Sequence, residues 1–310
     1  MEFPDPKEYF EAAQTLQDSL TSCRLCPRQC KVNRLFGEKG FCQAGLLPEI
    51  NVYMPHFGEE PCISGTKGSG TIFFAGCTMR CLYCQNHYIA HQGNGEQTSA
   101  INMAEIFLEL EQKGVHNINL VTPTPHIVTI LKALSLAREA GLSVPIVYNT
   151  SGYEDVNVLK RLAGKIEIYL PDYKYYDPMK AEELSDAFDY PQVAAIAIQE
   201  MINQTGHLQL DANGMAQKGV LIRHLVLPNQ LSDTAQVLTY LQKKYRDNIW
   251  ISLMSQYTPT AKTQDHQDLR RPITQEEYAQ ATLLLDKLGL DKGFIQNLNS
   301  ATNEYLPSFR

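Results

Sequence analysis

Residues 71–86 read TIFFAGCTMRCLYCQN, a short apolar run followed at once by three cysteines in the spacing C-x3-C-x2-C. The run TIFFA (71–75) is β-branched and aromatic, as expected of a buried strand. In parallel α/β folds, reactive groups gather in the loops after the carboxyl ends of the strands. We therefore predict that Cys77, Cys81 and Cys84 lie at a site where the first strand of a sheet ends.

Five further apolar runs follow this strand and predict the rest of the sheet: NINLV (117–121), PIVYN (145–149), IEIYL (166–170), VLIRHLVL (220–227) and NIWISLM (248–254). Segments of helical period lie between them, and several end at glycine, a common helix stop. A hairpin with its turn at Asn213-Gly214 is predicted to lead into the fifth strand. Continuous apolar strands alternating with helices predict a parallel sheet covered by helices, either barrel-like or doubly wound.

Composition and charge narrow the class of protein. The 310 residues are 44% hydrophobic and 20% charged, as in an ordinary globular protein. A formal charge of −7 argues against nucleic acid or an anionic membrane as the main partner. No apolar run approaches the roughly 20 residues that span a bilayer. The start of the chain, MEFPDPKEYFEAAQ, lacks the basic and apolar regions of a signal peptide, so a cytoplasmic protein is expected.

Three cysteines on one loop are one ligand short of a closed metal site. If they hold three irons of a 4Fe–4S cluster, the fourth iron keeps an open position, as a catalytic zinc ion does. A closed site would need a fourth ligand, such as Cys62, His56 or His87. The spacing favours the open cluster.

The cysteine motif, with Tyr83 before its last cysteine, is the signature of radical S-adenosylmethionine (SAM) enzymes. The wider text, including HNINLVTPTPH, PIVYNTSGY, IYLPDYKYYDP and RHLVLPN, resembles the radical SAM proteins described as pyruvate formate-lyase activating enzyme-like. The resemblance covers about residues 23–257 and is strongest with the subgroup that has an N-terminal cysteine module. It implies a partial (β/α)6 barrel similar to a TIM barrel, which agrees with the six strand–helix units.

The same resemblance implies the chemistry. Cys77, Cys81 and Cys84 would hold the cluster, and SAM would bind its open iron. An electron from a donor such as flavodoxin or ferredoxin would then cleave SAM to methionine and a 5′-deoxyadenosyl radical that abstracts hydrogen. The expected target is a glycyl-radical enzyme or another polypeptide. Two alternatives are a small-metabolite substrate and a non-catalytic iron–sulfur or zinc protein.

Contacts with SAM are implied at the ends of successive strands. Tyr83 would lie near the adenine. The segment VTPT (121–124) stands where the family has Gly-Gly-Glu, so threonine hydroxyls or carbonyls would replace that motif. The segments YNTSG and LPDYK and the arginine of RHLVLP match polar positions of the activating enzymes. The implied contacts are Thr122, Thr124, Asn149, Thr150, Ser151, Asp172, Lys174 and Arg223. Taken singly, Asp172 and Lys174 could be a solvated pair and Arg223 a structural ion-pair partner.

A second cysteine group precedes the barrel: Cys23, Cys26, Cys30 and Cys42. Four thiolates in this spacing suit zinc or a second iron–sulfur cluster, and a segment so poor in apolar residues needs a metal to stay ordered. Disulfides are the less favoured interpretation in a reducing compartment. Cys62 is left over and is expected to be a small buried hydrophobe. The predicted domains are an N-terminal helix with this metal-binding module at 1–65 and the radical SAM partial barrel at 66–310.

Overall fold

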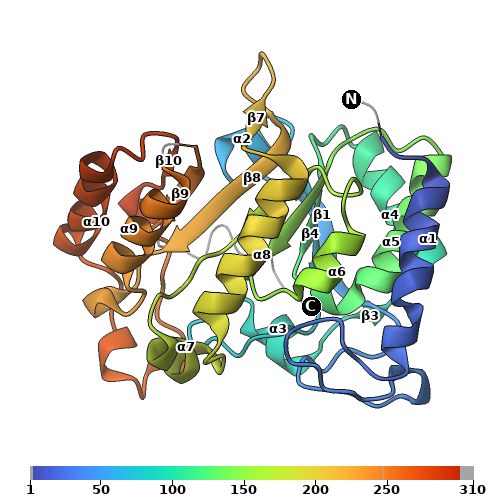
Figure 1. Cartoon of the computed structure of the whole chain (residues 1–310), viewed down its shortest axis with the longest axis horizontal. Helices are drawn as coiled ribbons and strands as arrows, with labels where there is room; N and C mark the ends of the chain where they lie inside the picture. Colours follow the sequence, from blue (N-terminus) through green and yellow to red (C-terminus); the bar gives the residue numbers. More distant parts are fainter. Residues whose placement is uncertain (1–2, 247, 301–310) are drawn as a thin grey trace.

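A mostly parallel sheet runs through the molecule, with helices packed beside it (Figure 1). The computed structural model describes residues 3–246 and 248–300. In these ranges the strand order is β10-β9-β8-β6-β5-β4-β2-β1-β3, and neighbouring strands from β2 to β10 run parallel. The parallel strands are β2 (Ser69–Phe74), β4 (Ile118–Val121), β5 (Ile146–Thr150), β6 (Ile168–Pro171), β8 (Ala216–Leu225), β9 (Trp250–Met254) and β10 (Gly293–Ile295).

All six predicted strands form, and their order in the sheet follows their order in the chain. A doubly wound sheet would reverse direction at a switch point, and no such reversal occurs between β2 and β10. The architecture is therefore a mixed α/β fold whose parallel sheet has the order of a partial barrel. Every residue of β2 is buried, which explains why the strand is apolar along its whole length.

Three strands were not predicted. β1 (Glu49–His56) pairs antiparallel with β2 from Ile50 to His56, and β3 (Glu96–Gln97) pairs with β1. β1 contains proline and histidine and is mostly half-buried, so it lacks the apolar run that marks a core strand. The N-terminal segment is thus joined to the first barrel strand by a ladder of backbone hydrogen bonds. The third unpredicted strand, β10, is only three residues long.

Helices occupy the predicted intervals between the strands. They are α4 (Ala100–Gln112), α5 (Ile127–Glu139), α6 (Val156–Arg161), α8 (Tyr190–Thr205), α9 (Thr234–Tyr245) and α10 (Gln275–Leu288), and the predicted N-terminal helix α1 (Pro6–Gln17) precedes the sheet. Side-chain caps start several of them, such as Ser99 before α4 and the reciprocal pair Thr274 and Glu277 at α10. The short helices α2 (Pro61–Ser64), α3 (His87–Gln92) and α7 (Pro178–Ser185) were not predicted.

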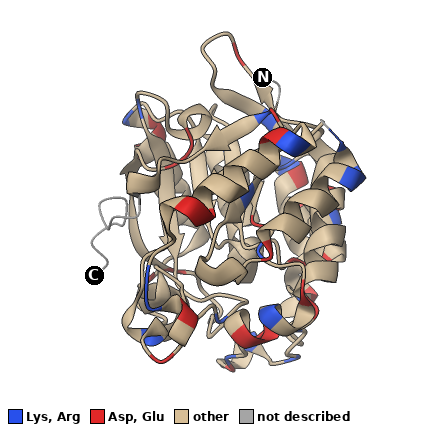
Figure 2. Ribbon diagram, turned by 90° about the vertical axis from the view of Figure 1, so that its left-hand side faces the viewer, with Lys and Arg blue, Asp and Glu red and all other residues tan. Residues whose placement is uncertain are grey.

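The first helix packs on the barrel rather than standing apart. α1 lies along α5 in Figure 1, where Lys132 donates to Gln17 at 2.8 Å and Ser135 to the Pro6 carbonyl at 2.7 Å. The predicted hairpin also forms between β7 (Gln209–Leu210) and β8, with Gly214 at a φ of 77° in its turn. Acidic and basic positions are interspersed over the face seen in Figure 2. Within the described ranges, the helices are too short or too polar to cross a bilayer.

Candidate functional site

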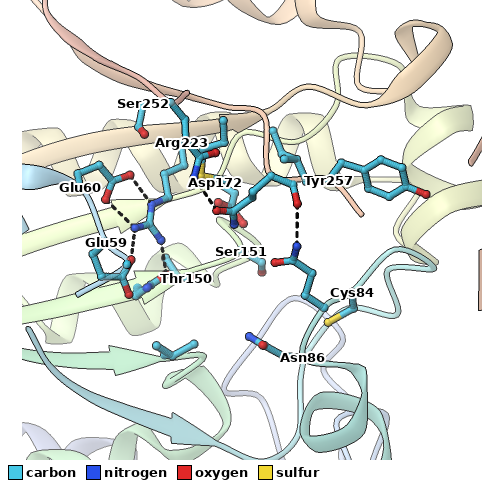
Figure 3. A pocket seen from close by; sticks show the side chains of 18 of the residues that line it. Glu59, Glu60, Cys84, Asn86, Thr150, Ser151, Asp172, Arg223, Ser252 and Tyr257 are labelled. Carbon is cyan, nitrogen blue, oxygen red and sulfur yellow. Dashed lines mark hydrogen bonds and ion pairs between the residues drawn. The ribbon is translucent and has the colours of Figure 1, made fainter. Parts of the chain in front are cut away.

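A cavity of about 670 Å³ lies at the carboxyl ends of the parallel strands (Figure 3). Its wall contains almost all of the barrel residues predicted to form the site: Cys77, Cys81, Tyr83, Cys84, Thr122, Asn149, Thr150, Ser151, Asp172, Lys174 and Arg223. These residues come from the ends of β2, β4, β5, β6 and β8, so the rule that placed them holds for five neighbouring strands.

The three-cysteine loop is held by backbone contacts on both sides. The N–H of Gly76 donates to Ile89 of α3 at 3.0 Å, and Leu82 donates to Leu184 of α7 at 2.9 Å. The Cys81 sulfur accepts a hydrogen bond from the Ser185 hydroxyl at 3.0 Å. The loop is therefore positioned by α3 and α7, neither of which was predicted.

Cys81 is buried, whereas Cys77 and Cys84 are half-buried in this loop. Burial raises the pKa of Cys77 to about 11, and the nearby Cys81 adds to the shift. Burial and the other two thiols also raise the pKa of Cys84. These shifts favour the neutral form of the Cys77 and Cys84 thiols in the free protein. A metal centre would bind here by displacing their protons, as thiolate ligation requires.

The described His, Cys, Asp and Glu side chains form no group of three or more arranged to hold a single metal ion. This applies to both cysteine groups. A zinc ion needs all its ligands to converge at about 2.0–2.3 Å. An iron–sulfur cluster does not, because each cysteine ligates a different iron. The arrangement at Cys77, Cys81 and Cys84 is therefore compatible with a cluster.

Asn86 gives a further indication that the cavity receives a ligand. It lies two residues after Cys84 and lines the cavity, beside its open centre in Figure 3. Its Oδ1 is buried and has no hydrogen-bond partner among the described residues. A buried acceptor is normally satisfied, so Oδ1 is expected to take a hydrogen bond from a bound group. The sequence analysis did not identify this residue.

Arg223 is paired with two carboxylates that the sequence analysis missed. Its Nε lies 2.8 Å from Glu60 Oε1, its Nη2 lies 2.6 Å from Glu60 Oε2, and Nη2 also contacts Glu59 (Figure 3). Burial opposes ionisation of Glu60, but the Arg223 cation outweighs it and lowers the pKa of that carboxyl. Arg223 is thus an ion-pair partner that also lines the cavity. Its remaining Nη1 faces Asn149 at 3.4 Å.

Asp172 and Lys174 form a pair 2.5 Å apart in the cavity wall. The pair is largely buried, with side chains 22% and 14% exposed, so it is not the solvated pair considered above. Burial disfavours the Lys174 ammonium, yet Asp172 and the nearby Cys81 raise its pKa well above the ordinary value. Lys174 therefore keeps a positive charge beside the cysteine loop.

Thr124 does not line the cavity. It is buried, and its hydroxyl donates to Glu154 Oε1 at 2.5 Å; Thr150 donates to the same oxygen. Tyr148 donates to the other oxygen at 3.3 Å. Burial raises the pKa of Glu154 to about 7. The hydrogen bond to Glu154 therefore holds the Thr124 hydroxyl away from the cavity, whereas Thr122 and Thr150 line it.

Amide and aromatic side chains complete the wall near β9 and β10. Gln85 donates to the Gln256 carbonyl at 2.8 Å, and Gln296 donates to the Gln256 side chain at 2.9 Å. Phe294 of β10 lines the cavity, and its ring packs on Trp250 with centroids 6.0 Å apart. Tyr83 is held from behind by Tyr175, whose hydroxyl lies 2.5 Å away.

The four cysteines of the N-terminal group lie near one another. Burial raises the pKa of Cys26, and Cys42, Cys23 and Cys30 each contribute to the shift. The chain turns back on itself here, since the N–H of Lys31 donates to Cys23 at 3.0 Å and that of Phe41 donates to the Cys30 sulfur at 3.4 Å. Metal binding by this group stays a prediction.

Comparison with known families finds a match within the barrel region. The model of the radical SAM superfamily matches residues 71–179, from β2 to the start of α7. This segment contains the three-cysteine loop and the cavity residues of β4, β5 and β6. The match supports the radical SAM superfamily.

Two relatives come from Methanocaldococcus jannaschii. The uncharacterized protein MJ0674 is 29% identical over 94% of this chain and 82% of its own length. The uncharacterized protein MJ0808 is 22% identical over 95% of this chain and 87% of its own length. Both alignments include the N-terminal cysteine segment as well as the barrel, because they cover nearly the whole chain.

Among solved structures, native anSMEcpe with bound AdoMet is 13% identical, with a TM-score of 0.48 over 72% of this chain and 61% of that one. Streptococcus suis SuiB bound to the precursor peptide SuiA is also 13% identical, with a TM-score of 0.49 over 73% of this chain and 48% of that one. The present chain thus spans about half to three fifths of these proteins.

Proposed function

We propose that this protein is a radical SAM enzyme in which Cys77, Cys81 and Cys84 hold a 4Fe–4S cluster and the adjoining cavity binds SAM. The observation that carries the proposal is the convergence of these three thiols with polar strand-end residues on one cavity. The superfamily match over residues 71–179 supports it. When bound, the cluster supplies an electron that splits SAM into methionine and a 5′-deoxyadenosyl radical able to abstract hydrogen.

The protein's own residues would bind and orient SAM. The proposed contacts are Tyr83, Thr122, Asn149, Thr150, Ser151, Asp172, Lys174 and Arg223, together with Asn86. Asp172 offers a carboxylate to the SAM amino group, Lys174 a cation to its carboxylate, and Asn86 Oδ1 an acceptor. Thr124 would act only indirectly, by fixing Glu154 behind Thr150.

We propose a polypeptide as the second substrate, with a glycyl-radical enzyme as one such target. Support comes from the cavity lining, where Phe57 is 61% exposed and Ile295 51% exposed. Exposed apolar side chains beside a cavity are typical of surfaces that bind another chain. A small metabolite is the second candidate.

We further propose flavodoxin or ferredoxin as the electron donor. Zinc or a second iron–sulfur cluster is proposed at Cys23, Cys26, Cys30 and Cys42. These cysteines belong to the proposed N-terminal module at 1–65, which precedes the barrel at 66–310.

The test is reductive cleavage of SAM under anaerobic conditions. The full chain is reconstituted with iron and sulfide, reduced with dithionite, and analysed for 5′-deoxyadenosine. We expect the product from the native protein and its loss after Cys77→Ala, Cys81→Ala or Cys84→Ala. Cys62→Ala is the matched control, because Cys62 is a buried cysteine of α2 outside both groups. Cleavage that survives in the three loop variants would refute the proposal.

Two further measurements address the finer assignments. Zinc and iron are quantified in native protein and in Cys26→Ser, which separates the two metals proposed for the N-terminal group. A glycyl radical detected by EPR on a co-incubated protein would support a glycyl-radical enzyme as target. 5′-Deoxyadenosine formed without any radical on polypeptides would favour the small metabolite.

A further inference from the structure

The N-terminal cysteine segment and the three-cysteine loop contact each other through two arginines. Arg28, between Cys26 and Cys30, donates from Nε to the Thr78 carbonyl at 3.0 Å. Arg80, next to Cys81, donates from Nη2 to the Phe41 carbonyl. Each cysteine segment thus sends one arginine to the backbone of the other.

Both arginine cations lie over the ring of Phe41. The guanidinium carbon of Arg28 is 3.9 Å from the ring centroid, and that of Arg80 is 4.5 Å from it. Both distances fall well within the range of cation–π attraction. Attraction to this shared ring offsets repulsion between the two like charges, so Phe41 favours both arginine contacts.

The backbones of the two segments also meet directly. A Cβ placed on Gly76 would lie 2.6 Å from the carbonyl oxygen of Cys42, so only glycine allows this approach. Arg80 then continues the contact into the loop, because its Nη1 lies 3.2 Å from the Cys77 carbonyl and 3.3 Å from that of Met79. Arg28 reaches the other side, donating to the Asp186 carbonyl after α7.

We propose that Arg28, Phe41 and Arg80 form a clasp through which the N-terminal cysteine group sets the conformation of the loop that carries Cys77, Cys81 and Cys84. They are positioning residues, because they act on the loop backbone and not on the cavity. The consequence is coupling: the state of the first cysteine group determines how well ordered the second one is. The inference deepens the proposed function and rests on it only for the role of the loop.

The test measures hydrogen exchange of loop amides 77–86 in the metal-free full chain and therefore needs no enzyme activity. Phe41→Leu keeps an apolar side chain but removes the ring face, and Phe41→Tyr keeps the ring. We expect about tenfold faster loop exchange in Phe41→Leu, because both cation–π contacts are lost, and native exchange in Phe41→Tyr. Arg28→Gln is compared with Arg24→Gln, which removes a charge from an exposed arginine of the same segment. Faster exchange is expected only in Arg28→Gln.

Coupling is tested by disabling the first cysteine group. We expect Cys26→Ser combined with Cys30→Ser to speed loop exchange in the otherwise native, metal-loaded chain. The same pair should have little further effect once Phe41→Leu is present. Amides 234–245 of α9 serve as the reference for global unfolding. If Arg28→Gln also accelerates exchange of the α9 amides, the milder Arg28→Lys replaces it. We expect loop exchange in Arg28→Lys to be faster than in the native chain and slower than in Arg28→Gln.

Loop exchange that is native in Phe41→Leu and in Arg28→Gln would overturn the clasp. The coupling would be overturned if the Cys26→Ser and Cys30→Ser pair accelerated loop exchange equally in the native chain and in Phe41→Leu. Failure of the proposed function would be recognised differently. In that case the native protein would form no 5′-deoxyadenosine, whatever the rate of exchange at the loop amides. The reduced cluster provides a second readout: the change in its EPR spectrum on adding SAM should weaken in Phe41→Leu and be restored in Phe41→Tyr.

Discussion

The hydroxyl of Ser185, at the end of α7, lies 3.0 Å from the sulfur of Cys81. A residue 104 positions away thus touches one thiol of the three-cysteine loop. Ser185 is fully buried and also contacts the Tyr175 hydroxyl at 2.7 Å, so its position is fixed by several partners. A hydrogen bond to a ligating sulfur stabilises the reduced state of an iron–sulfur cluster.

Ser185→Ala should therefore lower the reduction potential of the reconstituted cluster. One lost hydrogen bond corresponds to a shift of a few tens of millivolts in a one-electron couple. The shift is measured by EPR-monitored redox titration. Ser135→Ala is the control, because its hydroxyl donates to the Pro6 carbonyl at 2.7 Å, away from the cavity. An unchanged or higher potential in Ser185→Ala would contradict the expected role of this hydrogen bond.

Gly76→Ala should destabilise the protein more than Gly164→Ala. Both glycines have positive φ, 86° and 78°, so both substitutions incur backbone strain of about 1 kcal/mol. Only at Gly76 would the new methyl group collide with the Cys42 carbonyl, while Gly164 has nothing within 4 Å. We expect an additional loss of about 1–3 kcal/mol at Gly76, measured by urea denaturation. Equal losses in the two variants would show that the close approach to Cys42 is dispensable.

Glu154 should make the free energy of unfolding depend on pH. Burial raises its folded pKa to about 7 from an ordinary value of 4.5, so the folded state binds a proton that the unfolded state has lost. The contribution is fully present below about pH 4.5 and is lost as pH rises to about 7, with a slope near 1.4 kcal/mol per pH unit. Glu154→Gln removes this slope. The urea concentrations at the unfolding midpoint, measured at about pH 5 and at about pH 7.5, should therefore differ less in the variant than in the native protein.

Glu167 serves as an internal reference for that measurement. Its pKa is also raised to about 7, chiefly by burial, and it is retained in the Glu154→Gln variant. The difference between native protein and variant therefore isolates Glu154. If the two proteins lose stability equally over this pH range, the carboxyl of Glu154 does not carry the expected proton.

Arg223→Met should be strongly destabilising. It leaves the Glu59 and Glu60 carboxylates, whose side chains are 9% and 6% exposed, without their cation. Breaking such a buried pair typically costs about 3–5 kcal/mol, and adding Glu60→Gln should recover part of the loss. Arg271→Met is the surface control, because that arginine is 41% exposed and pairs with Glu277; a loss below about 1 kcal/mol is expected. The measurement is again urea denaturation, and similar losses at both arginines would be inconsistent with a buried ion cluster.

Sequence patterns predicted the barrel well because burial imposed them. The six predicted strands are mostly buried and therefore rich in apolar residues. Polar residues at their carboxyl ends, such as Asn149, Asp172 and Arg223, line one cavity, as predicted for parallel strands. β1 escaped prediction because it is an antiparallel addition with half-buried, mixed residues. β10 escaped because three residues are too few to show a pattern.

Pairing over long sequence distances explains most of what the sequence did not indicate at the site. Glu60 meets Arg223 across 163 residues, and nothing near Glu60 in the sequence indicates that partner. Thr124 was expected beside SAM, but Glu154, 30 residues later, draws its hydroxyl behind the wall. Asn86 stood next to the motif, and its unpaired amide oxygen becomes evident only from burial.

Trp250 is the one tryptophan of the sequence and packs on Phe294, a residue of the cavity wall. Its emission therefore arises from a single indole ring next to the cavity and contains no background from other tryptophans. Titration of the protein with SAM or a peptide can be followed by intrinsic fluorescence, without labels and without turnover. Occupancy of the cavity could then be measured in anaerobic cuvettes on the unmodified chain.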